Sequence, residues 1–206
     1  MSMPEKTTVT CPSCGQTLEY TRWHSINTDR ESALPDIISG KLFQVECPFC
    51  GQKLHMDYPL LFNDMLHRVM ISYTSLDHLE EVTASLAGSR QMGYRVRIVT
   101  DQLSLREKAA VFAAGLDDRV VEILKVLALR EVAGQLEGKK VEKAFYVPEG
   151  ENSGLQLLVD GQPSFLPLSP EAYEVLAEKC RDRLSDGDEE PVIDAFWAEI
   201  FLGLRG

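Results

Sequence analysis

The stretch Cys11-Pro12-Ser13-Cys14-Gly15 returns later in the chain, with one residue changed, as Cys47-Pro48-Phe49-Cys50-Gly51. A C-x-x-C turn places two sulfurs on one metal ion, and two such turns supply the four soft ligands that zinc prefers in a tetrahedron. Proline after the first cysteine restricts the turn, and glycine after the second tolerates a left-handed backbone. The sequence therefore predicts one structural zinc ion per chain, bound by Cys11, Cys14, Cys47 and Cys50.

Strand-like segments flank both cysteine turns. The predicted strands cover residues 7–10 and 16–26 around the first turn and residues 41–46 and 54–58 around the second. This strand–turn–strand order, present twice, is that of a zinc ribbon. The insert between the turns, residues 15–46 (32 residues), is longer than the usual spacing of about 15–20, so it must fold back to bring the turns together. A short helix is predicted within it, capped by Asp29 and ended by Gly40.

Two further stretches accompany the cysteine motifs, Tyr58-Pro59-Leu60-Leu61-Phe62-Asn63-Asp64 and Leu116-Asp117-Asp118-Arg119 at a helix start. With the paired C-P-x-C motifs and an insert of this size, they make the chain resemble the CpXC domain family over about residues 8–135. This bacterial and archaeal family is named for the cysteine motifs. The resemblance implies a metal-binding fold, and it implies no reaction because the family has no established biochemical activity.

The rest of the chain predicts helices and a second group of strands. Helices are expected over residues 75–86, 104–115 and 118–135, from Ser169, and from about Pro191, and strands over residues 68–73, 94–100, 144–147, 155–159 and 162–166. The helix over 118–135 is apolar on most of its circumference, with Asp118, Glu122 and Lys125 as its polar stripe. A helix of this kind lies at the centre of a core.

These elements predict an α+β fold with zinc-ribbon-like antiparallel strands, a helical middle, and a C-terminal β-hairpin with two helices. The predicted domains are residues 1–137 and residues 138–206, the second packed on the first. The first domain divides into a ribbon part, about residues 7–75, and a helical part, about residues 76–137.

Composition narrows the class of partner. The chain has 206 residues, 32 Asp and Glu against 21 Lys and Arg, and a net charge of −11. Residues 1–75 hold 6 basic and 8 acidic residues, a net charge of −2, so residues 76–206 carry the other −9. An acidic surface repels phosphate backbones, which makes nucleic acid an unlikely partner. A nucleic-acid-binding ribbon would need its basic residues on one face, namely Arg22, Arg30, Lys41, Lys53 and Arg68.

The sequence predicts a cytoplasmic protein with no membrane partner. Residues 1–6 lack the apolar run of a secretion signal, and no stretch approaches the roughly 18 apolar residues of a membrane helix. Five cysteines fit a reducing cytosol, where thiols bind metal more often than they form disulfides.

The cysteine turns and the histidines also have redox or catalytic interpretations, which the sequence supports less well than a structural role. A redox C-x-x-C needs a helix after its first thiol, and here glycine and strand-like sequence follow. His78-Leu79-Glu80 has half of a deaminase signature, but no P-C-x-x-C follows it. His24 and His55 lie near the cysteine turns and either hydrogen-bond the thiolates or lie on the sheet surface.

The favoured function is a non-enzymatic, zinc-stabilised module that binds an unknown protein. The alternatives are an enzyme with its site in a cleft between the ribbon and helical parts, and a nucleic-acid-binding zinc ribbon. An apolar stripe in the last helix, formed by Val192, Phe196, Trp197 and Ile200, is expected to dock on the hairpin of residues 144–159 or to form a homo-oligomer.

Overall fold

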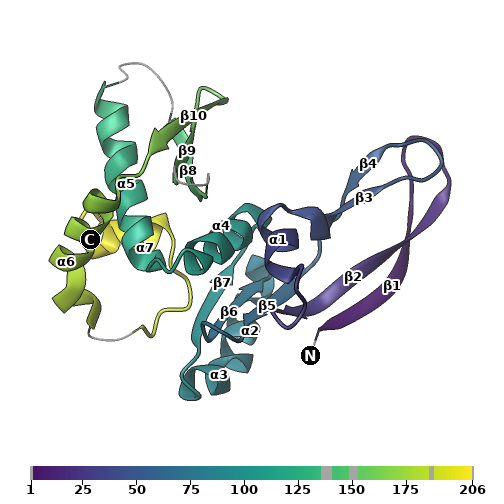
Figure 1. Cartoon of the computed structure of the whole chain (residues 1–206), viewed down its shortest axis with the longest axis horizontal. Helices are drawn as coiled ribbons and strands as arrows, with labels where there is room; N and C mark the ends of the chain where they lie inside the picture. Colours follow the sequence, from purple (N-terminus) through teal and green to yellow (C-terminus); the bar gives the residue numbers. More distant parts are fainter. Residues whose placement is uncertain (1, 136–140, 149–152, 186–187, 206) are drawn as a thin grey trace. The chain divides into compact units, whose positions relative to one another are not determined.

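The computed structural model describes residues 2–135, 141–148, 153–185 and 188–205 (Figure 1). The chain forms two compact units, Met1–Ala109 and Ala110–Gly206. Both units combine helices with strands, which confirms the predicted α+β class. The predicted domain boundary, between residues 137 and 138, lies outside the described residues and stays a prediction.

The first unit contains a five-stranded sheet in the order β1-β2-β5-β6-β7. Its strands are β1 (Met3–Thr10), β2 (Thr17–Asn27), β5 (Leu60–Asp64), β6 (Val69–Tyr73) and β7 (Arg95–Val99). β1 and β2 are antiparallel, as are β5 and β6, whereas β2 pairs with β5 and β6 pairs with β7 in parallel. The sheet is therefore mixed, although only antiparallel pairing was predicted.

Two strands of this sheet depart from the sequence prediction. β5 was not predicted as a strand, because Leu60, Leu61 and Phe62 are all apolar and show no alternation. β7 was predicted to be half-buried, yet four of its five residues are buried. Arg97 has no exposed surface, and its guanidinium group donates to the backbone oxygen of Val96 at 3.0 Å.

A small second sheet carries the second cysteine turn. It pairs β3 (Gln44–Glu46) with β4 (Lys53–His55) in antiparallel register. The short helix η1 (Lys41–Phe43) precedes this sheet. The helix predicted between the two cysteine turns is α1 (Ala33–Ile38), with Ser32 and not Asp29 at its N-cap position. Gly40 follows α1 with a φ of 75°, a left-handed conformation that ends a helix.

The remaining helices of the first unit begin and end at other residues than predicted. They are η2 (Leu76–His78), α2 (Leu79–Ser85), α3 (Ala87–Gln91) and α4 (Gln102–Ala113), the last of which crosses the boundary between the units. The helical segment continues past Gly88 to Gly93, which has a φ of 79°. Asp101, and not Ser104, caps α4, because its carboxylate accepts from the N–H of Ser104 at 2.9 Å and from its hydroxyl at 2.7 Å.

The second unit combines three helices with an antiparallel sheet. The helices are α5 (Asp118–Gln135), α6 (Pro170–Ser185) and α7 (Ala195–Phe201), and the strands are β8 (Val141–Val147), β9 (Gly154–Val159) and β10 (Gln162–Pro167), in the order β10-β9-β8. Asp160 and Gly161, both with positive φ, form the tight turn before β10. Ser169 caps α6 as predicted, accepting from the N–H of Ala172 at 3.3 Å.

One apolar core cluster of the second unit lies among its three helices. The buried residues of this cluster come from α5, α6 and α7: Val120, Ile123, Val126, Cys180, Leu184 and Ala198. The predicted inner stripe of α6 is confirmed, since Tyr173 and Leu176 pack against this cluster beside Cys180 and Leu184.

The last helix docks on its own chain, but not where the sequence predicted. α7 packs on α5 and α6 through Ala198, Trp197 and Phe201, whereas the described parts of the predicted hairpin, residues 144–148 and 153–159, are not among its main neighbours. It begins after Asp194, whose carboxylate accepts from the N–H of Trp197 at 2.9 Å, rather than near Pro191. Of the predicted stripe, Phe196 and Ile200 are 55% and 51% exposed.

α5 has the predicted bounds but a different buried face. Its first half is buried, whereas Leu127 is 40% exposed. The predicted polar stripe is also buried: Asp118, Glu122 and Lys125 are 0%, 3% and 7% exposed. Lys125 Nζ lies 3.0 Å from Glu122 Oε2, and such mutual pairing is what allows opposite charges to lie inside a protein. The prediction that this helix lies at the centre of a core therefore holds for its first half, whereas most of its second half is exposed or partly exposed.

A pair of matched substitutions in α5 tests this assignment. Ile123 has no exposed surface, so we expect Ile123→Ala to lower the free energy of unfolding by about 2–5 kcal/mol. Leu127→Ala should cost less than about 1 kcal/mol, because this side chain is already partly in water. Urea unfolding followed by circular dichroism measures both. Equal losses for the two variants would show that the buried face of α5 is assigned incorrectly.

Candidate metal centre

The two cysteine turns have the same backbone hydrogen bonds. The N–H of Cys11 donates to Gln16 O and the N–H of Gly15 donates to Cys11 O, both at 2.9 Å. The equivalent bonds of the second turn, from Cys47 to Gln52 O and from Gly51 to Cys47 O, are 2.8 and 2.9 Å long. Gly15 and Gly51 have φ values of 71° and 73°, the left-handed conformation that glycine adopts without strain.

These turns bring all four predicted ligands together. Their sulfur atoms lie within 4.8 Å of one another, and the separations of Cys11 Sγ from Cys50 Sγ and of Cys14 Sγ from Cys47 Sγ are both 3.7 Å. A regular tetrahedron with a metal–sulfur distance of about 2.3 Å has edges of about 3.8 Å. The cluster therefore has the dimensions of a four-thiolate metal site.

A longer repeat surrounds the cysteines, and the prediction from sequence overlooked it. Residues 9–18 and 45–54 share the pattern V-x-C-P-x-C-G-Q-x-L. Leu18 and Leu54 are buried with Cys11 and Cys47 in one cluster, against which Val9, Val45 and Met56 pack. The repeated valine and leucine therefore build a small apolar support under the sulfurs, a signal that alignment of the two turns could have found.

The sulfurs have unequal proton affinities. The backbone amide of Cys14 stabilises the Cys11 thiolate and contributes most to lowering the pKa of Cys11 to about 7. The amide of Gln16 acts on Cys14 in the same direction, but desolvation and the three neighbouring sulfurs outweigh it and raise the pKa of Cys14 to about 12. One thiolate therefore forms readily in this cluster, and further negative charge requires a cation to balance it.

The remaining predicted residues of interest have other partners. His24 Nε2 lies 2.8 Å from the Glu5 carboxylate across β1 and β2, which is a sheet-surface contact. His55 is exposed on β4. His78 is exposed next to Ser75, with Nδ1 2.8 Å from the hydroxyl. Cys180 lies in the helical core of the second unit and is absent from the sulfur cluster.

Most of the basic residues considered for nucleic acid have aromatic or acidic partners. Arg22 lies over the ring of Tyr58, and Arg30 over that of Trp23, at 5.7 and 4.7 Å. Arg30 and Lys41 share the buried Asp36, and Arg68 lies over Tyr94. These contacts balance or cover several of the charges that a phosphate backbone would need.

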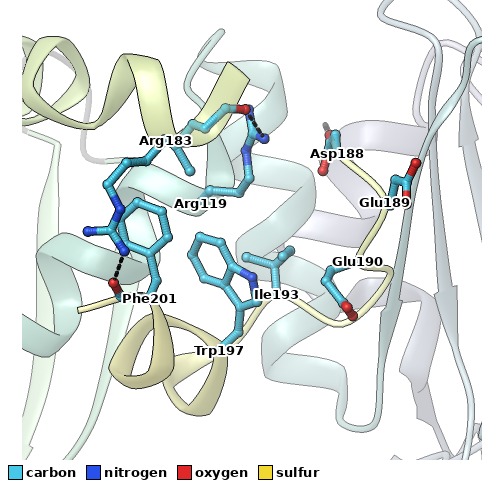
Figure 2. A pocket seen from close by; sticks show the side chains of 9 residues that line it. Arg119, Arg183, Asp188, Glu189, Glu190, Ile193, Trp197 and Phe201 are labelled. Atoms are coloured by element: carbon cyan, nitrogen blue, oxygen red, sulfur yellow. Dashed lines mark hydrogen bonds between the residues drawn. The ribbon is translucent and has the colours of Figure 1, made fainter. Parts of the chain in front are cut away.

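A cavity of about 240 Å³ lies within the second unit, lined by α5, α6, α7 and the segment before α7 (Figure 2). Arg119 in its wall pairs with Asp117 at 2.7 Å and donates to Leu184 O at 2.9 Å. Arg183 lies over the ring of Phe201, 3.8 Å from its centre. The nine described residues that line the cavity include no cysteine, histidine, serine or lysine. A second cavity of about 390 Å³, also in this unit, is lined mainly by apolar and aromatic side chains.

Two C-x-x-C turns that gather four sulfurs at tetrahedral spacing define a metal-binding module. The sequence profile described as "CpXC protein" matches residues 9–125, more than half of the chain. The chain therefore belongs to the CpXC family, as its motifs predicted. No curated protein and no solved structure matched it.

Among the helices in the described part of the chain, none combines the length and the apolarity needed to cross a bilayer.

The thiol chemistry makes a testable prediction about pH. A metal ion must displace the protons of these thiols, so its affinity should rise as the pH increases from about 6 to about 8, a range that contains the pKa of Cys11 near 7. Competition with a chromogenic chelator at several pH values measures the affinity, and a pH dye in unbuffered solution measures proton release. An affinity that does not change with pH would contradict ligation by these thiols.

Proposed function

We propose that Cys11, Cys14, Cys47 and Cys50 bind one structural zinc ion, and that the chain is a non-enzymatic zinc ribbon that serves as a protein-interaction module in the bacterial cytosol. The spacing of the four sulfurs, with two edges of 3.7 Å, carries this proposal. A set of four protein sulfurs completes a tetrahedron and leaves no position for a catalytic water.

The small size of the surrounding elements supports a structural role for the metal. β3 and β4 have three residues each, and the cluster beneath the sulfurs contains only Leu18 and Leu54 as buried side chains besides the cysteines. So little apolar surface only weakly stabilises the cysteine-bearing ends of the two hairpins, and a metal crosslink would add the free energy that holds these ends together.

The surroundings of the thiols favour a structural site over a redox one. Reactive C-x-x-C thiols lie at the start of a helix, which lowers their pKa. Here each turn leads into a strand, β2 or β4. Tetrahedral four-sulfur sites hold zinc or iron, so metal content distinguishes these two ions.

An enzymatic function is the second candidate, and the two cavities of the second unit are its physical basis. The smaller one contains charged and aromatic side chains, but Arg119 is occupied by Asp117 and Leu184. The larger one is mainly apolar, with Glu174 as its charged residue. The larger cavity also contains Ser153, but among the described residues no hydrogen bond joins it to Glu174 as a nucleophile to a base, and interaction is the favoured function.

Metal analysis tests the proposed site. We expect protein purified without added metal to contain about one zinc per chain, and Cys14→Ser to reduce this content and the melting temperature, because three sulfurs leave the tetrahedron open. Cys180→Ser is the matched control and should retain full zinc. A chelator should destabilise the wild-type chain and not the already metal-free variant. Stoichiometric iron, or less than about half an equivalent of any metal, would overturn the assignment of zinc.

The oligomeric state tests the proposed partner surface. Self-association through Val192, Phe196, Trp197 and Ile200 is the alternative to docking within the chain, and Phe196 and Ile200 are the two of these residues that are more than half exposed. If these two residues form an interface, the double variant Phe196→Ser, Ile200→Ser should be a monomer where the wild-type chain is a dimer. Its melting temperature should lie within a few degrees of that of the wild-type chain. Light scattering coupled to size exclusion measures the mass. A wild-type chain that is monomeric would exclude this surface as a self-association site.

A further inference from the structure

The four cysteines differ in their access to solvent. Cys11 and Cys47, the first cysteine of each turn, are 0% and 1% exposed. Cys14 and Cys50, the second of each turn, are much more accessible. A dissolved small molecule therefore reaches the second cysteine of each turn more readily than the first.

The second turn repeats the backbone hydrogen bonds of the first, so Cys50 occupies the position that corresponds to Cys14.

The short sulfur–sulfur distances join the two turns. Cys14 lies 3.7 Å from Cys47, and Cys50 lies 3.7 Å from Cys11. The second cysteine of each turn therefore has a buried cysteine of the other turn as a close neighbour. To form a disulfide bond of about 2.0 Å, the two sulfurs must approach by about 1.7 Å.

We propose that Cys14 and Cys50 are sites of oxidation by hydroperoxides, and that this oxidation ends in two disulfides between the turns, Cys14–Cys47 and Cys11–Cys50, with release of the metal. This inference rests on the proposed four-thiolate metal site.

The chemistry balances with hydrogen peroxide as the oxidant. The exposed thiolate attacks one peroxide oxygen, so an S–O bond forms, the O–O bond breaks, and hydroxide leaves. The buried thiolate of the other turn then attacks the sulfenic sulfur, so the S–S bond forms, the S–O bond breaks, and a second hydroxide leaves. Each peroxide accepts two electrons from two thiolates. Two peroxides consume all four ligands, and the metal ion dissociates.

The connectivity decides what happens to the fold. Disulfides between the turns replace the metal as a crosslink, so β1 and β2 stay tied to β3 and β4 after the metal has left. Disulfides within each turn, Cys11–Cys14 and Cys47–Cys50, would not connect the cysteine turn of one hairpin to that of the other. The proposed connectivity therefore keeps the two turns joined after the metal has left.

Tryptic peptides distinguish these connectivities directly. Cleavage after Lys6, Arg22, Lys41 and Lys53 gives the peptides 7–22 and 42–53, each with two of the cysteines. The metal-loaded full chain is treated with hydrogen peroxide, metal release is followed with a chromogenic chelator, and the alkylated digest is analysed by mass spectrometry. We expect the two peptides to be joined, with fragmentation between the cysteines assigning Cys14 to Cys47 and Cys11 to Cys50.

A trapping experiment tests the first step. At less than one equivalent of peroxide, a dimedone probe should label Cys14 and Cys50 about tenfold more than Cys11 and Cys47. The chain with Cys180→Ser serves as the control against exchange with the fifth cysteine, and it should give the same pattern.

The outcomes separate this inference from the proposed function. A chain that contains no metal as purified contradicts the metal site itself. If the chain binds metal but yields separate peptides with a disulfide within each turn, labels mainly Cys11 and Cys47, or keeps its metal in about millimolar peroxide, the metal site stands and the oxidation proposal is wrong.

Discussion

Four sulfurs within 4.8 Å of one another set the constraint on which the first unit depends. Although the amide of Gln16 acts in the other direction, desolvation and the three neighbouring sulfurs raise the pKa of Cys14 to about 12, so uncompensated negative charge on this sulfur is unfavourable. A cation that balances the charge turns the same closeness into a crosslink. β2 carries this crosslink into the body of the unit, because it begins three residues after Cys14 and pairs at its far end, through Ser25, Ile26 and Asn27, with β5. The strand that leaves the metal site is also a strand of the main sheet.

Aromatic packing fastens the second hairpin to the same sheet. The ring of Phe43, which precedes β3, lies 5.0 Å from that of Tyr58 and 6.1 Å from that of Tyr73 on β6. The Tyr73 hydroxyl donates to the Asp57 carboxylate, which also accepts from Gln102 on α4 at 3.0 Å. Both hairpins that carry cysteines are thus anchored in one core, so the proposed metal would brace two arms whose bases are already fixed.

Features that depend on neighbouring residues were predicted well from the sequence, whereas the packing of one helix or strand on another was not. The cysteine turns, the strand β9 and the Ser169 cap depend on a few neighbouring residues, and all could be predicted from them. β5 escaped prediction because a central strand can be apolar on both faces. The buried Glu122–Lys125 pair and the docking of α7 on α5 depend on which surfaces meet in three dimensions, and the same apolar and charged patterns are compatible with several partners. Likewise, sequence showed which cysteines form the cluster but not that one of each pair is exposed.

Two prolines in β10 limit the hydrogen bonds that the outer edge of this strand can form. The N–H of Leu168 points inward, to Ser153 O at 3.0 Å, so alternation along the strand turns the N–H positions of residues 163, 165 and 167 away from β9. Pro163 and Pro167 have no N–H, which leaves Phe165 as the one outward donor of a strand whose residues are all exposed. Such an edge cannot serve as a template for an incoming strand. The exposed strand β10 can therefore lie at the edge of its sheet without readily joining the same strand of another copy edge to edge.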